Sequence, residues 1–391
     1  MFQIRTLNNI SAKGLSKFEG GDYSLGEHIE TPDAILLRSH KLSLEETGDA
    51  LLAIGRAGAG VNNIPVEAMS ARGIVVFNTP GANANAVKEL VMAGLLLSCR
   101  GIVQGIDYVN HLSADQDKAT LNKDVEAAKK QFKGSELKGR TLGVVGLGAI
   151  GSMVADMALG LGMNVLGYDP AISVEAAWRL SSQVQRMENM AALLARSDMV
   201  TLHVPALPET EGLIDAAQVQ GMKRGAVLLN FARGELVVPE AIREGVTSGQ
   251  ISQYISDFPT PELLGLEGIM ATPHLGASTD EAEENCAMMV ADQMIDFLEH
   301  GNIKNSVNFP AVSLERSATG SRIAIVNRNV PRLLGSVLSI LADRNINVID
   351  MINKSREDLA YNLIDIEAAP DEELAGMLRK VEDVISVRLI P

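Results

Sequence analysis

Hydrophobic residues in the first part of the chain fall into short runs that predict a parallel β-sheet. Residues 34–38 (AILLR), 51–54 and 73–78 (GIVVFN) are mostly apolar, and each run is followed by a polar or glycine-containing turn and a helical pattern. Continuous apolar runs are typical of strands whose two faces are both covered by helices. Residues 87–100 then form a long apolar helix. This pattern indicates an α/β module.

A second series of the same kind starts at Arg140. Helical patterns separate most of the short apolar runs that predict its strands. These runs are residues 142–145, 165–168, 199–203, 227–230, 253–256 and 269–271. Residues 278–281 (STDE) then have the spacing of a capping box and predict a helix that runs to about His300. The chain is therefore predicted to contain two parallel-sheet α/β modules of the Rossmann-like or flavodoxin-like type.

Residues 322–391 follow a different order. Apolar runs and helical patterns alternate there as strand, helix, strand, strand, helix, strand, which is the order of a ferredoxin-like βαββαβ module. Residues 311–321 lack such a pattern and are predicted to be a linker. The predicted fold class is thus α/β, with a small α+β module at the C-terminal end.

Charge and cysteine content narrow the classes of partner. The chain has 391 residues and a formal net charge of −15, which argues against nucleic acid or an anionic membrane as a partner. Cys99 and Cys286 are too few for a disulfide framework or a zinc site, so we expect buried thiols in a reducing compartment and no metal. No apolar run could cross a bilayer, and the N-terminus lacks the apolar core of a signal peptide. We therefore expect a cytoplasmic protein in which any anionic substrate needs a local basic pocket.

One glycine-rich motif points to a dinucleotide. Gly146, Gly148 and Gly151 follow a predicted strand and open a helix, and Asp169 ends the next strand about 20 residues on. The first glycine permits the tight turn, the second lets the backbone approach a pyrophosphate, and the third lets the helix pack on the sheet. The Asp169 carboxylate would accept hydrogen bonds from ribose hydroxyls and repel a 2′-phosphate, so the predicted cofactor is NAD rather than NADP. The competing interpretation is an ordinary strand-to-helix turn.

Unusual polar residues follow two later strands. Arg233 comes just past AVLLN and His274 just past GIMA, with Asp257 and Glu262 between them in the chain. Ligands bind at the carboxyl ends of strands in open α/β sheets, so these side chains are expected to converge. In a hydride-transfer site, the histidine would exchange the hydroxyl proton, Glu262 would hold the imidazole, and the arginine would clamp a substrate carboxylate. Loop capping or surface solubility is the alternative role for each residue.

The motifs GRAGAGVNNI, FNTPGANANAVKE, TLGVVGLGAIG, LNFARGELV and TPHLGAST resemble those of the D-isomer-specific 2-hydroxyacid dehydrogenases, and the resemblance covers nearly the whole chain. It implies that Arg233, Glu262 and His274 are catalytic. It also implies NAD-dependent oxidation of 3-phospho-D-glycerate to 3-phosphohydroxypyruvate, the first step of L-serine biosynthesis. Two alternatives stay open: another D-2-hydroxy acid of the glycerate, lactate or 2-hydroxyglutarate type, and a non-catalytic NAD-sensing role on the same scaffold.

The resemblance also implies the residues of two binding sites. The cofactor would contact the glycine-rich loop and the segments after later strands: Gly146, Gly148, Ala149, Ile150, Gly151, Asp169, His203, Val204, Phe231, Ala232, Arg233, Asp257, His274 and Gly276. The substrate would contact loop amides and cations: Arg38, Ser39, Arg56, Gly58, Ala59, Gly60, Asn78 and Lys88. Arg38, Arg56 and Lys88 are the cations available for a phosphate, although an ordinary surface or helix charge explains Arg56 and Lys88 equally well.

The same resemblance implies a discontinuous order of domains. Residues 1–95 with 275–310 would bind the substrate, residues 96–274 would bind NAD, and residues 322–391 would form a regulatory module similar to ACT domains. Such modules bind small effectors and pair with a copy from another subunit. We therefore expect a homo-oligomer, a dimer or tetramer, with a subunit contact in this module. Because every catalytic candidate precedes it, deletion of the module is expected to leave catalysis largely intact.

An amino-acid effector of this module would contact Asn327, Asn329 and Asn347. Arg332 stands where relatives of the module favour glycine, and its side chain would crowd an effector. The sequence therefore leaves open whether serine inhibits the protein.

Overall fold

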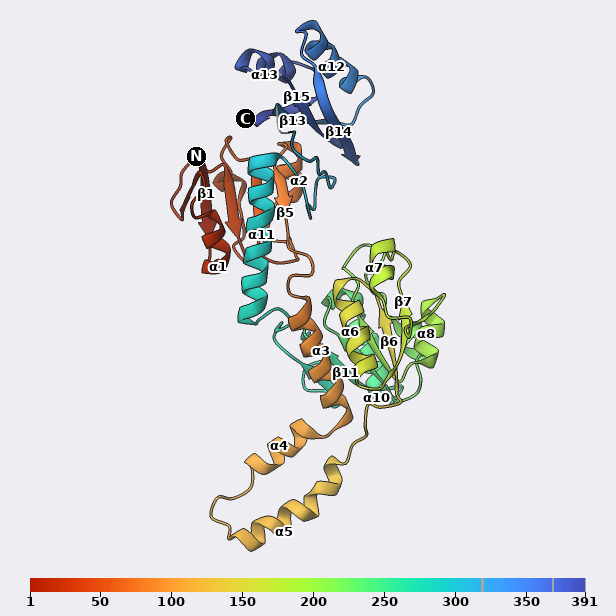
Figure 1. Ribbon diagram of the computed structural model, residues 1–391. Coiled ribbons are helices and arrows are strands. Elements are labelled where there is room, and N and C mark those ends of the chain that lie inside the picture. The colour runs from red at the N-terminus through yellow and green to blue at the C-terminus, as the bar shows by residue number, and fades with distance from the viewer. Residues whose placement is uncertain (318–319, 368, 391) are drawn as a thin grey trace. The chain divides into compact units, whose positions relative to one another are not determined.

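The computed structural model describes residues 1–317, 320–367 and 369–390. They form two compact units (Figure 1). The first comprises Met1–Asn83 with the described residues from Asp280 onward, and the second comprises Ala84–Thr279. Each unit contains a parallel sheet, as the apolar runs predict, and the first also contains a small antiparallel sheet. The predicted fold class is confirmed.

The parallel sheet of the first unit has the strand order β2-β1-β3-β4-β5. Its strands are β1 (Phe2–Leu7), β2 (Tyr23–Gly26), β3 (Ala34–Leu37), β4 (Ala53–Arg56) and β5 (Val75–Phe77). The accompanying helices are α1 (Ala12–Leu15), α2 (Val66–Ala71) and α11 (Asp280–His300), with 3-10 turns η1 (Ser16–Phe18) and η2 (Leu44–Glu46). Every residue of β3 is buried, as expected for a central strand covered on both faces.

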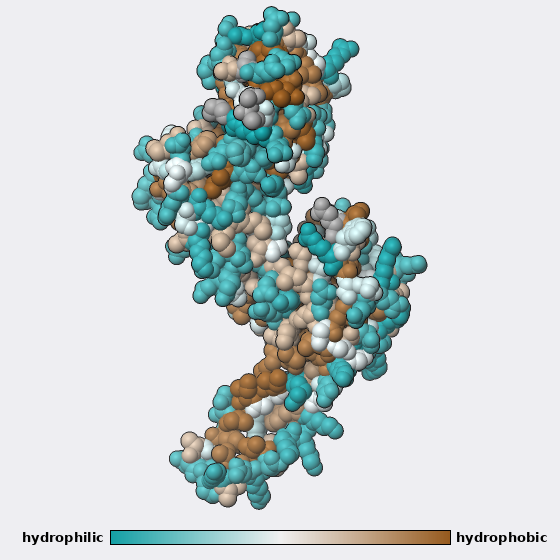
Figure 2. Space-filling model, in the orientation of Figure 1, coloured by the Kyte–Doolittle hydropathy of each residue, from teal (hydrophilic) through white to brown (hydrophobic). Residues whose placement is uncertain are grey.

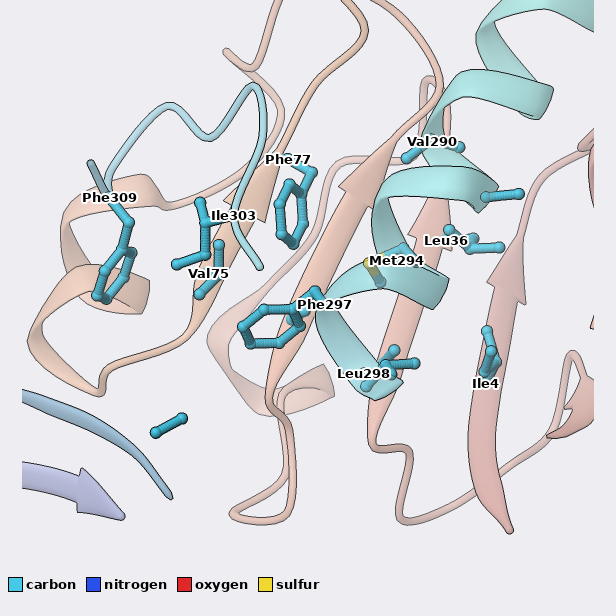
Figure 3. Packing of buried hydrophobic residues seen from close by; sticks show 14 of the residues in the cluster. Ile4, Leu36, Val75, Phe77, Val290, Met294, Phe297, Leu298, Ile303 and Phe309 are labelled. Carbon is cyan, nitrogen blue, oxygen red and sulfur yellow. The ribbon is translucent and has the colours of Figure 1, made fainter. Parts of the chain in front are cut away.

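Helix α11 supplies one side of the core of this unit. Its Val290 and Phe297 point at the strands and pack among residues that include Leu36 and Phe77 (Figure 3). The rings of Phe77 and Phe297 meet edge to face, with centroids 5.5 Å apart. The helix approaches so closely that a Cβ at Gly55 of β4 would lie 2.6 Å from Val290 Cγ2. This late segment of the chain therefore completes the core of the N-terminal sheet.

The βαββαβ module follows, with the strand order β14-β15-β13-β16. Its elements are β13 (Ser321–Arg328), α12 (Leu333–Asp343), β14 (Val348–Arg356), β15 (Leu359–Ile366), α13 (Glu372–Arg379) and β16 (Val384–Ile390). The two helices cover one face of the sheet (Figure 1). The opposite face contributes Val326, Tyr361 and Leu363 to the same buried cluster as Phe297 of α11. Both faces of the central strands are therefore covered within the chain, while the edge strand β14 is largely exposed.

The second unit has a seven-stranded parallel sheet in the order β12-β11-β10-β9-β6-β7-β8. Its strands are β6 (Thr141–Val145), β7 (Asn164–Tyr168), β8 (Gln185–Arg186), β9 (Met199–Leu202), β10 (Ala226–Asn230), β11 (Ile251–Ser256) and β12 (Ile269–Ala271). Its helices are α3 (Ala84–Cys99), α4 (Ile102–Asn110), α5 (Lys118–Ala128), α6 (Ala149–Gly160), α7 (Val174–Arg179), α8 (Met190–Arg196), α9 (Ala216–Gly221) and α10 (Pro239–Thr247), with 3-10 turns η3 (Lys129–Phe132) and η4 (Gly234–Leu236). Strand order reverses beside β6, which is where doubly wound sheets bind their ligands.

The compact units divide the chain at other places than the sequence suggests. The predicted boundary after residue 95 moves to residue 83, because helix α3 packs on α6 and β10 of the second unit. The predicted boundary at 274 moves to 279, so the segment around His274 stays with the nucleotide-type sheet. The C-terminal module joins the first unit through the shared buried cluster instead of standing apart. Two residues of the predicted linker, 318 and 319, lie outside the described residues.

Helices α4 and α5 form an arm of the second unit. Apolar side chains are exposed along it, and hydrophobic colouring marks it in Figure 2. They are Ile102, Val103, Ile106, Val109, Leu121 and Val125. Cys99 and Cys286 are both free and buried, as predicted. Among the described residues, no helix is long and apolar enough to span a membrane, and no group of side chains has the composition of a metal site.

Candidate active site

The glycine-rich loop has the backbone that a dinucleotide site requires. Gly146 has φ +90°, and a Cβ there would lie 2.6 Å from the carbonyl oxygen of His203. A Cβ at Gly151 would lie 1.9 Å from the carbonyl oxygen of Gly146, so only glycine lets helix α6 pack this closely. A Cβ at Gly148 would meet no atom within 4 Å, which leaves room for a ligand against the backbone. The residues present therefore fit a pyrophosphate.

The start of helix α6 faces this open space. Gly148 occupies the N-cap position, and among the residues described no side chain caps the first amides at Ala149 and Ile150. Uncapped amides and the positive end of the helix dipole favour a bound anion. The loop and the helix start therefore hold the predicted cofactor residues from Gly146 to Gly151 in one place.

Asp169 lies directly beside the loop, at the carboxyl end of β7. Its Oδ2 accepts a hydrogen bond from the Leu147 amide at 2.8 Å, and its Oδ1 accepts one from the Ala171 amide at 2.9 Å. Backbone amides thus fix the carboxylate in orientation while each oxygen keeps further acceptor capacity. This geometry suits a pair of ribose hydroxyls.

His203 and Val204 border the other side of the glycine turn. Burial lowers the pKa of His203 to about 3, so its ring is neutral at pH 7. Its Nε2 lies 2.9 Å from the Thr201 hydroxyl, and Val204 Cγ1 lies within contact distance of Gly146. A neutral ring and a valine methyl form an apolar wall, as the flat base of a nucleotide requires. His203 is therefore a packing residue and does not act as a general acid at pH 7.

Arg233 follows β10, and a buried amide shapes its surroundings. The Asn230 side chain is fully buried, donates to the Arg233 carbonyl at 2.8 Å and accepts from the Ala232 amide at 3.2 Å. The Arg233 guanidinium is half-buried and donates to the Ala232 carbonyl at 2.6 Å. Phe231 is buried in the core. The sequence analysis assigned no role to Asn230, although a polar residue inside the run AVLLN was a visible signal.

Asp257 forms hydrogen bonds with the loop that carries His274. Its carboxylate is buried and accepts hydrogen bonds from the Thr272 hydroxyl at 2.6 Å and from the Leu275 and Gly276 amides at 2.7 Å each. Its carbonyl oxygen accepts from the His274 amide at 3.1 Å. These bonds bracket His274 on both sides in the chain. Asp257 therefore positions the loop, a role that its expected contact with the cofactor did not reveal.

His274 itself is exposed and carries backbone strain. Its φ is +58°, an unusual conformation for a residue with a side chain, and such strain collects at functional sites. Its ring meets the Phe258 ring edge to face at 5.0 Å. Glu262 is exposed on the loop after β11, and within the described parts of the chain no hydrogen bond or ion pair joins it to His274. The structure thus brings His274 and Asp257 together, whereas the contact between Glu262 and the imidazole stays a prediction.

In the first unit, the predicted substrate residues gather at the carboxyl ends of β3, β4 and β5. The Arg38 guanidinium forms an ion pair with Glu283 of α11 at 2.7 Å, and the Arg38 carbonyl accepts from Arg56 Nε at 3.1 Å. Gly58 has φ +152°, and a Cβ there would lie 1.9 Å from Arg56 Nη1. Asn78 donates to the Ala59 carbonyl at 2.6 Å. This segment, residues 58–60, therefore lies between the Arg56 cation and Asn78.

Two further predicted substrate residues have no contact that ties them to a ligand site in the described structure. Ser39 is exposed, and no hydrogen bond of its side chain is present in the described structure. Lys88 belongs to α3 of the second unit, where its Nζ donates to Asn85 Oδ1 at 2.5 Å. Glu283, which the sequence analysis did not assign, is the ion-pair partner of Arg38. No local pattern could have shown that pairing.

The predicted effector residues differ in their surroundings. Asn327 is buried, and its Oδ1 accepts from the Asn362 side chain at 2.7 Å. This side chain therefore links two neighbouring strands of the sheet. Asn329 donates to the Glu357 carbonyl at 3.2 Å, and Asn347 is exposed. Arg332 has φ +74° and occupies the N-cap of α12, a conformation that glycine adopts without strain.

Comparisons with known proteins show which sequences this chain is similar to. Residues 102–276 match the family described as D-isomer specific 2-hydroxyacid dehydrogenase, NAD binding domain. The D-3-phosphoglycerate dehydrogenase of Escherichia coli K12 is 31% identical over an alignment of 407 positions, which covers 99% of this chain and 95% of that protein. The D-3-phosphoglycerate dehydrogenase of Methanocaldococcus jannaschii is 35% identical over 350 residues. That match covers 87% of this chain and 62% of the relative's length.

Solved structures agree with the sequence matches. NAD-bound 3-phosphoglycerate dehydrogenase of Entamoeba histolytica is similar with a TM-score of 0.60 and 26% identity, over 78% of this chain and 98% of that one. D-lactate dehydrogenase of Aquifex aeolicus, at 22% identity and a TM-score of 0.61, shares the fold. The predicted cofactor, NAD, is confirmed by the matched nucleotide-binding domain and by the fit of the glycine-rich loop. The chain belongs to the D-isomer-specific 2-hydroxyacid dehydrogenase family.

Proposed function

We propose that the protein oxidises 3-phospho-D-glycerate to 3-phosphohydroxypyruvate with NAD, the first step of L-serine biosynthesis. The observation that carries this proposal is the group formed by Arg38, Arg56 and the loop of residues 58–60, which places cations and backbone amides together on a chain with a net charge of −15. An acidic protein needs such a local basic group to bind a phosphorylated acid. The relatives named above act on this substrate, which supports the same assignment.

The proposed reaction assigns a task to each candidate catalytic residue. Arg233 binds the substrate carboxylate through its guanidinium and so orients the carbon that bears the hydroxyl. His274 removes the hydroxyl proton at a ring nitrogen as the carbonyl forms, and it returns the proton in the reverse direction. Glu262 accepts a hydrogen bond from the imidazolium and so orients the ring. NAD supplies the acceptor for the hydride that leaves the same carbon.

Asp257 and Asn230 hold the backbone segments that carry His274 and Arg233. The three hydrogen bonds to the Asp257 carboxylate hold the loop that carries His274, and Asn230 fixes the backbone on either side of Arg233. Holding catalytic side chains on a fixed backbone lowers the entropic cost of reaching the reactive geometry. Both are therefore positioning residues.

A second substrate class is favoured by one observation. The Glu283 carboxylate lies 2.7 Å from Arg38 and offsets part of its charge, which would weaken a phosphate contact. A 2-hydroxy acid without a phosphate, such as D-glycerate, D-lactate or 2-hydroxyglutarate, would then need no cation besides the one that binds its carboxylate. Turnover of these acids as efficient as that of 3-phospho-D-glycerate would favour this alternative.

One assay tests the proposal. Purified protein is given NAD and each of these D-hydroxy acids in turn, and NADH formation is followed by absorbance. We expect the highest kcat/KM with 3-phospho-D-glycerate. NAD binding without NADH formation from any acid would overturn the proposal and favour an NAD-sensing role.

We further infer a cytoplasmic homo-oligomer. Ile102, Val103, Ile106 and Val109 expose an apolar stripe on helix α4 of the arm, and a second copy with the same stripe is a matching partner. The largely exposed strand β14 at the edge of the small sheet is the corresponding candidate in the C-terminal module. Light scattering of an Ile106→Glu variant tests the first contact, and an unchanged mass would exclude it. An amino-acid effector is tested by titrating L-serine against the initial rate.

A further inference from the structure

The C-terminal end of helix α11 is completed by side chains from outside the helix. The last carbonyl groups of any helix lack partners within it and need other donors. Arg388 Nη2 donates to the Phe297 carbonyl at 2.6 Å, and Arg388 Nη1 donates to the Leu298 carbonyl at 3.5 Å. Arg316 donates to the Glu299 carbonyl at 3.3 Å and Arg322 to the His300 carbonyl at 2.8 Å.

These donors belong to the C-terminal module and to the segment that leads into it. Arg322 is fully buried in β13, and Asp365 of β15 binds its guanidinium through two bonds of 2.6 and 2.8 Å. Arg388 of β16 lies 4.4 Å over the Phe297 ring. Tyr361 of β15 adds a hydrogen bond of 2.7 Å to the Gly301 carbonyl, just past the helix. The cations also complement the negative end of the helix dipole.

The other end of the same helix lies among the substrate candidates. Glu283 in its first turn forms the ion pair with Arg38. The helix has 21 residues and thus spans about 31 Å, with no glycine or proline inside it to bend it. Its buried residues, Val290 and Phe297 among them, pack along the sheet, so a shift at one end is passed along a stiff element.

We propose that Arg388, Arg322 and Tyr361 are positioning residues for the substrate site. They hold the C-terminal end of α11, and α11 in turn holds Glu283 and Arg38 in register with the loop of residues 58–60. By holding α11, the βαββαβ module then helps to set the affinity for the substrate, whatever effector it binds. This differs from the expectation that deletion of the module leaves catalysis intact, and it rests on the proposed function for the identity of the substrate.

The test compares full-length variants of Arg388. Arg388→Met keeps the apolar stem and removes the donors, Arg388→Lys restores a cation that can donate, and Arg328→Met is the matched control at the exposed end of β13. For Arg388→Met we expect the KM for 3-phospho-D-glycerate to rise about fivefold, less than the loss of a direct charge-assisted hydrogen bond would cost, with kcat and the Kd for NAD within about twofold. Arg388→Lys should recover much of the affinity, and Arg328→Met should match the parent protein.

Hydrogen exchange supplies a readout that does not need turnover. In Arg388→Met, amides of residues 280–290 should exchange faster along with those near residue 300. Faster exchange confined to residues 297–303, with an unchanged KM, would overturn the proposal and leave the contacts a local role. Tyr361→Phe, which removes a single hydroxyl, provides a second variant should Arg388→Met not fold, and it should move KM in the same direction. If the parent protein turns over no acid, the proposed function fails, while the exchange result still decides whether the module holds α11.

Discussion

The cofactor loop of the second unit and the cation group of the first unit are built in opposite ways. In the loop, backbone contacts within one strand-to-helix segment decide the geometry, since Gly151 packs on the Gly146 carbonyl. The Asp169 carboxylate, at the end of the next strand, accepts from the Leu147 amide. In the cation group, side chains from distant parts of the chain decide it, since Arg38 follows β3 and its partner Glu283 lies on α11. A site made of local backbone contacts leaves a motif in the sequence, whereas a site made of distant side-chain pairs does not.

The largest expected effect concerns the second unit, where backbone hydrogen bonds to Asp257 hold the loop that carries His274. His274→Ala should lower kcat by about 10²–10⁴-fold, because the hydroxyl proton loses its acceptor, while the Kd for NAD stays near the parent value. Steady-state kinetics and NAD titration measure the two effects. Parent-level turnover in this variant would refute the assigned role.

Cofactor choice is the next largest effect. The Asp169 carboxylate would repel the 2′-phosphate of NADP, so the parent protein should prefer NAD by about a hundredfold in kcat/KM, or about 2.7 kcal/mol. Asp169→Ala should narrow that preference, chiefly by weakening NAD. Equal kcat/KM for both cofactors in the parent protein would show that Asp169 does not select the cofactor.

The buried ring of His203 predicts a pH effect on stability. Its folded pKa of about 3 lies below the ordinary 6.5, so between these values the unfolded chain binds a proton that the folded chain does not. This residue's contribution to stability is therefore complete above pH 6.5 and declines as the pH falls. It should amount to a loss of about 2 kcal/mol at pH 5. Chemical denaturation at pH 7 and pH 5 should show a smaller decline for His203→Gln; an identical decline would assign the effect to other groups.

The smallest expected effect concerns the ion pair between Glu283 and Arg38 in the first unit. Glu283→Gln keeps an acceptor for Arg38 but removes the negative charge, so the KM for 3-phospho-D-glycerate should fall about threefold. The KM for D-glycerate should stay unchanged. Glu284→Gln, whose parent residue pairs with Lys13, is the matched control. An equal change of KM for both acids would show that the pair does not act on the phosphate.

The fold was largely predictable from the sequence, and the exceptions have physical reasons. Apolar runs predict β3, β5, β9 and β10 because those strands are buried on both faces. The edge strand β2, its neighbour β1 and the short edge strand β8 were not predicted, since their exposed or partly exposed positions carry polar residues. The compact units divide the chain at residue 83 because α3 packs against α6, and composition does not show such packing.

The same reasoning explains the candidate sites. The glycine-rich loop, Arg233 and His274 stand at strand ends that the pattern predicts, so their places could be inferred. The roles of Asp257 and Glu283 could not, because each depends on a partner brought close only by the tertiary fold. The second covered face of the C-terminal sheet was not predicted either, because its contact with the cluster around Phe297 of α11 is made only by the tertiary fold.

The central claim, that the cations of the first unit recognise a phosphate, is tested most directly by one ratio. The kcat/KM for 3-phospho-D-glycerate is divided by that for D-glycerate, in the parent protein and in Arg38→Met and Arg56→Met. We predict a ratio of at least about a hundred in the parent and a fall of about tenfold or more in at least one variant, because a charge-assisted contact to the phosphate is lost. A parent ratio near one, or a ratio unchanged in both variants, would contradict the account.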